Sequence, residues 1–156
     1  MTTNLVEANR LARDLMDHYG LQDWRLEWGN AKNQFGVCYY IRRILRFSRP
    51  LTKARSLDEF RNTVLHEIAH ALVGHDHGHD RVWRAMFISM GGNGKRLSGG
   101  VPTEVTRAMS NYILRCAVTG RELGTRQRRT MAAIDRLICK CHREQVLWEE
   151  NTQKTL

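Results

Sequence analysis

The sequence predicts an α+β fold, and three features of its N-terminal part lead to that prediction. Residues 4–18 carry apolar side chains at helical spacing. Residues 24–47 contain three short runs in which apolar or aromatic residues alternate with polar ones, as in half-buried strands. Residues 57–73 return to helical spacing and follow a helix-capping sequence. A helix, three strands and a helix in this order are typical of an α+β sandwich.

The first helix is amphipathic, and Gly20 is expected to end it because glycine readily adopts the backbone conformation that closes a helix. Its apolar side consists of Leu5, Ala8, Leu11, Ala12, Leu15 and Met16. The strands are expected at residues 24–28, 35–40 and 42–47, with a turn at 29–33. The sequence therefore places a three-stranded sheet after one amphipathic helix.

The second helix, residues 57–73, has the clearest boundaries of the expected elements. Ser56 can cap its first turn while Glu59 bonds back to the Ser56 backbone, and Gly74 is a natural stop. Helical spacing predicts a buried stripe made of Phe60, Val64, Leu65, Ile68 and Leu72. A further helical run follows at about residues 80–90, so a third helix is expected there.

The second helix contains the motif H-E-x-x-H at residues 66–70. His66 and His70 are four residues apart, so both imidazoles lie on one helix face and can reach the same Zn²⁺ ion. Glu67 projects beside them, where a carboxylate can take a proton from an activated water. The motif predicts a hydrolytic zinc site with His66 and His70 as ligands and Glu67 as general base. The same histidines could be ordinary polar residues of a half-exposed helix, but the capped, amphipathic helix in a small chain favours the zinc site.

A catalytic zinc site needs a third protein ligand and one open position, and the segment after the second helix offers three histidines. We favour His79, because it begins the third helical run and Trp83, four residues on, can pack under its imidazole. His77 is the second choice and His75 the third. The two histidines that do not bind are expected to be polar loop residues near the metal.

These residues resemble those of the SprT-like metallopeptidases, a family that includes the Spartan proteases. The family order is H-E-x-x-H, a variable loop and then H-G-x-x-[FW]. This chain has His66-Glu67-Ile68-Ala69-His70, a short loop and His79-x-x-x-Trp83, with Asp80 in place of the usual glycine. Residues 43–51 are also similar to the family strand that ends in a serine before the zinc helix. The resemblance covers about residues 4–92.

The resemblance implies a small zincin-like domain at residues 1–92, made of a helix, a three-stranded sheet, the zinc helix and a further helix. It also implies one catalytic Zn²⁺ and an extended substrate peptide that adds to the sheet edge, in a groove between the last strand and the zinc helix. A Gly-rich linker is expected at residues 93–102. Its glycines lack the strand-to-helix context of a phosphate-binding loop, so that interpretation is not favoured.

Residues 103–156 are expected to form a basic module that resembles the C-terminal zinc ribbon of SprT-like proteins, in intact or degenerate form. The ribbon pattern is C-x₂-C twice, but Thr119 stands where the second cysteine would be. A second, structural zinc would have to use Cys116, Cys139, Cys141 and His142. Alternatively, the ribbon has lost its metal and residues 130–138 form a helix. Cys38 is isolated and is expected to be a core thiol.

Length and composition limit the remaining possibilities. A chain of 156 residues fits one domain plus a small appendage, and the absence of an apolar run of about 18 residues predicts no membrane span. The first residues lack a basic segment followed by an apolar one, so we expect no secretory signal and a cytoplasmic monomer. In that compartment the four cysteines are expected to be thiols or metal ligands, not disulfides.

The chain is strongly basic, with a formal net charge of +9. Five lysines among the 25 basic residues leave 20 arginines, whose planar donor forks match phosphate. We therefore expect a polyanionic partner, most simply DNA. The residues expected to contact it are Arg121, Arg126, Arg128 and Arg129. A solvated basic surface without a partner is the alternative.

Together these observations predict a zinc-dependent endopeptidase, and the resemblance implies substrates that are proteins held near DNA, at the nucleoid or elsewhere. Two other functions fit the same residues. One is a DNA-binding protein whose zinc site is structural or regulatory, with little peptidase activity. The other is a cytosolic metalloprotease that cleaves one specific repressor. Glu67 argues against the first alternative, because a purely structural zinc site gains nothing from a carboxylate at that position.

Overall fold

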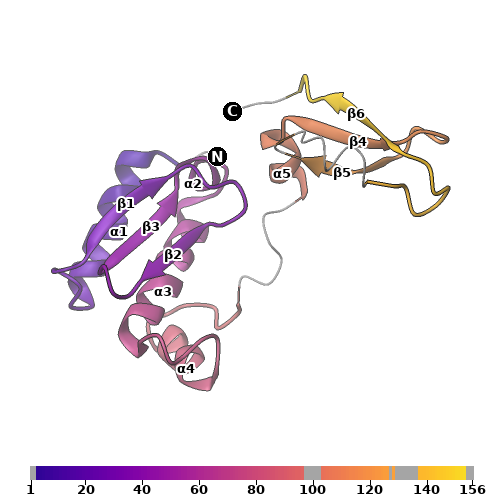
Figure 1. Cartoon of the computed structure of the whole chain (residues 1–156). Coiled ribbons are helices and arrows are strands. Elements are labelled where there is room, and N and C mark those ends of the chain that lie inside the picture. Colours follow the sequence, from indigo (N-terminus) through magenta and orange to yellow (C-terminus); the bar gives the residue numbers. More distant parts are fainter. Residues whose placement is uncertain (1–2, 97–102, 127, 129–136, 154–156) are drawn as a thin grey trace. The chain divides into compact units, whose positions relative to one another are not determined.

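The computed structural model describes residues 3–96, 103–126, 128 and 137–153. The chain is a mixed α+β protein, as the sequence predicted, and it divides into two compact units, Met1–Val101 and Pro102–Leu156 (Figure 1). Among the helices of the described ranges, none is both long enough and apolar enough to cross a membrane.

The first unit follows the expected order of elements, with one addition. The elements are α1 (Leu5–His18), β1 (Arg25–Gly29), β2 (Gly36–Tyr39), β3 (Ile44–Ser48), α2 (Arg49–Lys53), α3 (Leu57–Val73) and α4 (Arg81–Ser89). The short helix α2 was not predicted. It forms because the Ser48 hydroxyl accepts the Leu51 N–H while Pro50 occupies the first turn, where its missing N–H costs nothing.

The strand order in this sheet is β1-β3-β2, so the last strand of the unit lies at its centre. β1 and β3 run parallel, whereas β2 and β3 form an antiparallel hairpin through the turn at residues 40–43. The expectation of a substrate groove beside the last strand is therefore wrong, because β3 is paired along both edges. The strand that lies at the sheet edge and packs against α3 is β2.

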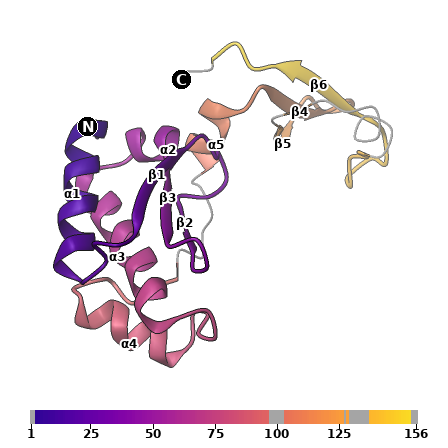
Figure 2. The same cartoon turned by 60° about the vertical axis from the view of Figure 1, so that its left-hand side comes forward.

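Helices α1 and α3 cover one face of the sheet (Figures 1 and 2). Trp28 of β1 stacks on Phe60 of α3, with ring centroids 5.8 Å apart. The core between sheet and helices includes Ala8, Ala12, Met16, Leu45, Phe47, Phe60, Val64, Leu65 and Ile68. Leu72 was predicted to extend the buried stripe of α3, but it is 38% exposed, so the stripe ends about one turn earlier.

Helix α3 begins and ends where the sequence predicted. The Ser56 hydroxyl accepts the Glu59 N–H and the Glu59 carboxylate accepts the Ser56 N–H, which completes the capping box. Gly74 follows the helix with a φ of +88°, a backbone region that favours glycine.

Helix α4 begins at Asp80, whose carboxylate accepts the backbone N–H groups of Val82 and Trp83 at 2.9 and 3.0 Å. Aspartate is among the residue types favoured at a helix N-cap. The cap also fixes the preceding residue, His79, just before the start of α4.

The second unit contains α5 (Thr103–Met109) and an antiparallel sheet of β4 (Tyr112–Cys116), β5 (Glu122–Arg126) and β6 (Val146–Glu150), in the order β5-β4-β6. Most of the helix expected at residues 130–138 falls outside the described residues. Ile138 is described, and it forms an isolated β-bridge with Gln145 instead of a helical turn. Of the expected linker, residues 93–96 are described and irregular, and the rest lies outside the described residues.

Candidate active site

Three imidazoles converge in the first unit. His66 and His70 lie one turn apart on α3, and His79 lies just before α4. Nε2 of His79 is 3.0 Å from Nε2 of His66 and 3.1 Å from Nε2 of His70. Ligands of a tetrahedral zinc ion, each about 2.05 Å from the metal, lie roughly 3.3 Å from one another. Both distances are close to the spacing of a metal-ligand set, and the ligand atoms of all three histidines lie within 4.8 Å of one another.

The histidines are held in the form that binds metals. Burial, together with the neighbouring imidazoles, lowers the pKa of His66 to about 3 and that of His70 to about 4. Burial likewise lowers the pKa of His79. Neutral imidazoles whose Nε2 atoms meet at one point direct lone pairs at each other, and a cation at that point relieves the repulsion. These residues fit a metal ion.

An aromatic floor supports the three imidazoles. Trp83 of α4 is fully buried, and its ring centroid lies 4.6 Å from that of His79, 4.7 Å from His66 and 5.3 Å from His70. Phe87, one turn further along α4, packs on both Trp83 and His66. The expected contact between Trp83 and His79 is present, and the same indole also supports the other two rings.

The two alternative histidines of the loop lie elsewhere. Nδ1 of His77 is 2.7 Å from the Asp80 carboxylate, and the side chain of His75 is 76% exposed. Among the described residues, the metal-compatible group of the first unit contains His66, His70 and His79. Of the three choices, the structure brings only His79 to the H-E-x-x-H pair.

Glu67 lies in a dry environment beside this group. Its side chain is buried on α3, where burial raises the pKa of the carboxyl to about 8. A carboxyl whose pKa lies near neutrality is suited to accept a proton and to release it again. Helix α3 thus carries a buried carboxyl group of raised pKa directly after the potential metal ligand His66.

Gly36, the first residue of β2, lies directly against Glu67. A Cβ atom at position 36 would be 2.8 Å from Cγ and 2.9 Å from Oε1 of Glu67, closer than side-chain atoms approach. Gly36 was not among the predicted site residues. A glycine inside a strand is itself a signal of close approach, and it could have pointed to this contact.

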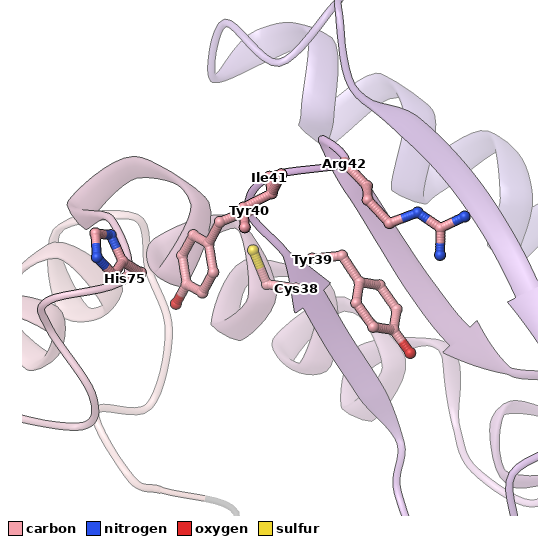
Figure 3. A pocket seen from close by; sticks show the side chains of 6 residues that line it. All are labelled: Cys38, Tyr39, Tyr40, Ile41, Arg42 and His75. Carbon is pink, nitrogen blue, oxygen red and sulfur yellow. The ribbon is translucent and has the colours of Figure 1, made fainter.

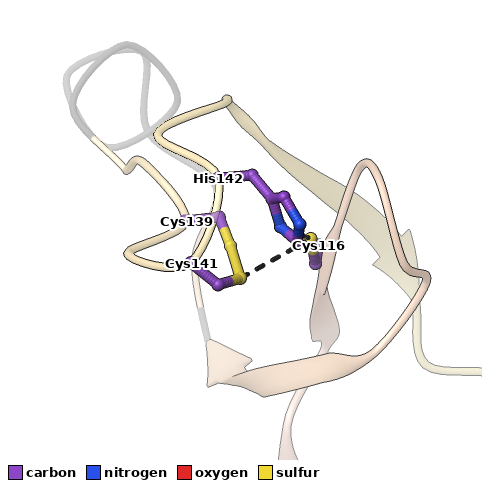
Figure 4. Close-up of side chains that lie close together, drawn as sticks. All are labelled: Cys116, Cys139, Cys141 and His142. Carbon is purple, nitrogen blue, oxygen red and sulfur yellow. Dashed lines mark hydrogen bonds between the residues drawn. A yellow bond between two sulfur atoms is a disulfide. The ribbon is translucent and has the colours of Figure 1, made fainter.

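A second group of potential ligands lies in the other unit. The Cys116 sulfur is 3.8 Å from the Cys141 sulfur and 3.4 Å from Nδ1 of His142 (Figure 4). Together with Cys139, their ligand atoms all lie within 4.8 Å of one another, so the group could hold a metal ion. Hydrogen bonds from Thr119, the residue in place of a ribbon cysteine, lower the pKa of Cys116 to about 6.

In the structure, a disulfide joins Cys139 and Cys141, which the sequence analysis did not expect (Figure 4). A cysteine pair separated by one residue brings its two sulfurs together whether they form a bond or share a metal. The two states exclude each other, because a thiolate is needed for metal binding. Cys38, as expected, is a free cysteine, and burial raises its pKa to about 12.

Three of the four arginines predicted to contact nucleic acid are exposed at the surface of the second unit. Arg121, Arg126 and Arg128 form no ion pair with the acidic residues of the described ranges, whereas Arg107 and Arg115 are paired with Glu122 and Glu149. Arg129 lies outside the described residues. The exposed guanidinium groups are thus available to an anionic partner.

The chain matches the SprT-like family over residues 7–107, a range that includes all three histidines, Glu67 and the aromatic floor. No curated protein matches the chain.

The close approach of Gly36 to Glu67 predicts that Gly36→Ala lowers the free energy of unfolding by about 1–3 kcal/mol through overpacking. Gly29→Ala, in β1 of the same sheet, is the control, because its Cβ would meet only the flexible Arg46 side chain at 3.2 Å. Urea unfolding of both variants, and of Gly36→Ala combined with Glu67→Ala, measures the effect. The contact between Gly36 and Glu67 is absent if Gly36→Ala and Gly29→Ala lower the free energy of unfolding equally. It is also absent if adding Glu67→Ala does not reduce the effect of Gly36→Ala.

The raised pKa of Glu67 predicts how pH affects the metal-free chain. The folded state keeps a proton on Glu67 that the unfolded state releases above about pH 4.5, so stability is lost as pH rises from about 4.5 to about 8. Glu67→Gln removes this loss. In the presence of a chelator, the variant should exceed the parent in unfolding free energy by up to about 3 kcal/mol at pH 7, and by little at pH 5. A difference that does not change with pH contradicts the assignment.

Proposed function

The chain belongs to the SprT-like family, and from this we propose that it is a zinc-dependent endopeptidase that acts on DNA-associated proteins. The observation that supports the proposal most directly is the convergence of three neutral imidazoles beside a buried carboxyl group of raised pKa. A structural metal site needs the imidazoles and does not need the carboxyl.

His66, His70 and His79 would hold the zinc ion through their Nε2 atoms. When bound, zinc is a Lewis acid that lowers the pKa of a water molecule toward ~7 and polarises a carbonyl group. Trp83 and Phe87 exclude solvent beneath the imidazoles and hold their rings in orientation. The protein contributes the ligand geometry and the dry environment.

Glu67 moves the proton. Its carboxylate accepts a proton from the attacking water, and the resulting acid donates it to the nitrogen of the leaving amine. Gly36 leaves room for the carboxyl group and restricts its position from the side of β2. The substrate is an extended peptide that pairs with the outer edge of β2, so its backbone passes the strand that borders Glu67.

The second unit would direct this activity to DNA. Arg121, Arg126 and Arg128 are exposed and form no ion pair among the described residues, and the chain as a whole carries a net charge of +9. Guanidinium groups bind phosphates by charge and by paired hydrogen bonds. Binding to DNA would place the peptidase near proteins that are held on the same DNA, which restricts its substrates by proximity.

The peptidase proposal predicts that Glu67→Gln abolishes cleavage of a DNA-bound protein, by about 100-fold or more, while zinc remains bound. His70→Ala should lose both the metal and the activity. His77→Ala is the matched control, because His77 pairs with Asp80 and lies outside the ligand group. Zinc is measured by elemental analysis and cleavage by gel electrophoresis. A Glu67→Gln chain that cleaves like the parent would instead favour the DNA-binding protein with a structural zinc.

The DNA proposal predicts an affinity that falls steeply with salt concentration, because binding releases counterions from the phosphates. Fluorescence anisotropy of a labelled oligonucleotide, measured from roughly 50 to 200 mM salt, tests this salt dependence. Replacing Arg126 and Arg128 by glutamine should weaken binding and reduce the salt slope by about 1 per lost phosphate contact. Arg10→Gln, on an exposed position of α1, should change neither. Salt-independent binding would remove DNA from the proposal.

A further inference from the structure

The first unit contains a cavity that the proposed chemistry does not use. Its volume is about 610 Å³, and it is lined by Cys38, Tyr39, Tyr40, Ile41, Arg42 and His75 (Figure 3). The first five of these residues run from the end of β2 into the hairpin turn, and His75 comes from the loop after α3. The cavity therefore lies where the edge strand leaves the sheet.

The cavity borders the outer edge of β2. Tyr39 and Tyr40 point to opposite sides of the strand, and both line the same space (Figure 3). Only the edge or the tip of a strand is open to both of its faces, and β3 occupies the inner edge of β2. The space thus lies at the end of β2, next to the edge with which an added strand would pair.

The size of the cavity suits a short stretch of extended chain. A residue in a sheet fills about 160 Å³, from a rise of about 3.3 Å, a strand spacing of about 4.8 Å and a layer spacing of about 10 Å. A volume of about 610 Å³ therefore holds about four residues of an extended peptide with their side chains.

The lining is mostly apolar and carries no negative charge. Ile41 is fully exposed at the hairpin tip, and the Tyr40 ring meets the His75 ring at 6.3 Å between centroids. Burial raises the pKa of the Cys38 thiol to about 12 and also raises that of Tyr40, so both are neutral at pH 7. A fully exposed isoleucine beside two aromatic rings is a surface that gains free energy when an apolar side chain covers it.

The cavity and Glu67 both border β2. Gly36, Cys38 and Tyr40 alternate along β2 and its end, and Gly36 touches Glu67. The Glu67 carboxylate is close enough to raise the pKa of both Cys38 and Tyr40. At about 3.3 Å per residue, positions 38 to 40 lie about two to four residues along an added strand from the point opposite Glu67.

We propose that this cavity is a specificity subsite, which takes an apolar or aromatic side chain located about two to four residues from the scissile bond of an extended substrate. The inference rests on the proposed peptidase function and adds a substrate preference to it. Tyr40, Ile41 and His75 are the residues that select this substrate side chain by contact. They contact substrate and take no part in proton transfer.

Binding of two peptides to the zinc-loaded Glu67→Gln chain tests the subsite without requiring cleavage. The peptides are identical Ser- and Thr-rich decamers, except that one carries a single phenylalanine where the other has serine. Fluorescence anisotropy should give about tenfold tighter binding, or more, for the phenylalanine peptide. Ile41→Asp should abolish the preference, and Val6→Asp, an exposed apolar residue on α1, should leave it intact. Equal binding of the two peptides, or a preference that survives Ile41→Asp, overturns the subsite.

A photoreactive version locates the side chain directly. A benzophenone side chain in place of the phenylalanine should crosslink to residues 38–42 or to His75, as read by mass spectrometry. Adducts elsewhere overturn the subsite. So does a parent chain that dimerises in light scattering and becomes monomeric with Ile41→Asp, since that assigns the cavity to self-association. A parent chain that prefers the phenylalanine peptide but cleaves no peptide contradicts the peptidase function. The same result still supports the cavity as a binding site for an apolar side chain.

Discussion

The burial of three polar side chains on one helix is the constraint on which the first unit depends. His66, Glu67 and His70 lie in the part of α3 that otherwise contributes Val64, Leu65 and Ile68 to the core. Burying polar groups costs free energy unless they find partners, and the Nε2 atoms of His66 and His70 both face the Nε2 atom of a third neutral imidazole, His79. Convergence of the Nε2 atoms on one point provides a place where a cation offsets that cost.

Several parts of the sequence serve this one arrangement. The capping box and Gly74 fix the length of α3, and Asp80 fixes the start of α4. With both helices fixed, Trp83 lies under all three imidazoles and His79 completes the ligand set. The edge strand β2 closes the other side, where glycine at position 36 is the residue that leaves space for Glu67. The fold and the candidate metal site therefore depend on the same contacts.

Local chemistry made helices α1, α3 and α4 predictable, whereas the order of the strands depends on contacts between distant residues. Ser56, Glu59 and Gly74 act within a few residues of one another, so the limits of α3 follow from the sequence alone. The alternation of residues in β3 indicates a strand but not its place in the sheet. Pairing along both edges of β3 depends on β1, which lies far from it in the sequence. The contact between Gly36 and Glu67 joins residues 31 positions apart, and it needs the three-dimensional structure. The sequence also could not decide the chemical state of Cys139 and Cys141, because their spacing suits both a disulfide and two thiolate ligands of a metal.

The zinc content of the purified full-length chain tests the central claim most directly. After dialysis against buffered zinc without chelator, elemental analysis should find one more zinc per chain in the parent than in the His79→Ala variant. Cys116→Ser should leave that difference unchanged, because Cys116 belongs to the other unit. A parent chain that takes up no zinc, or a His79→Ala chain that retains as much as the parent, would contradict the account.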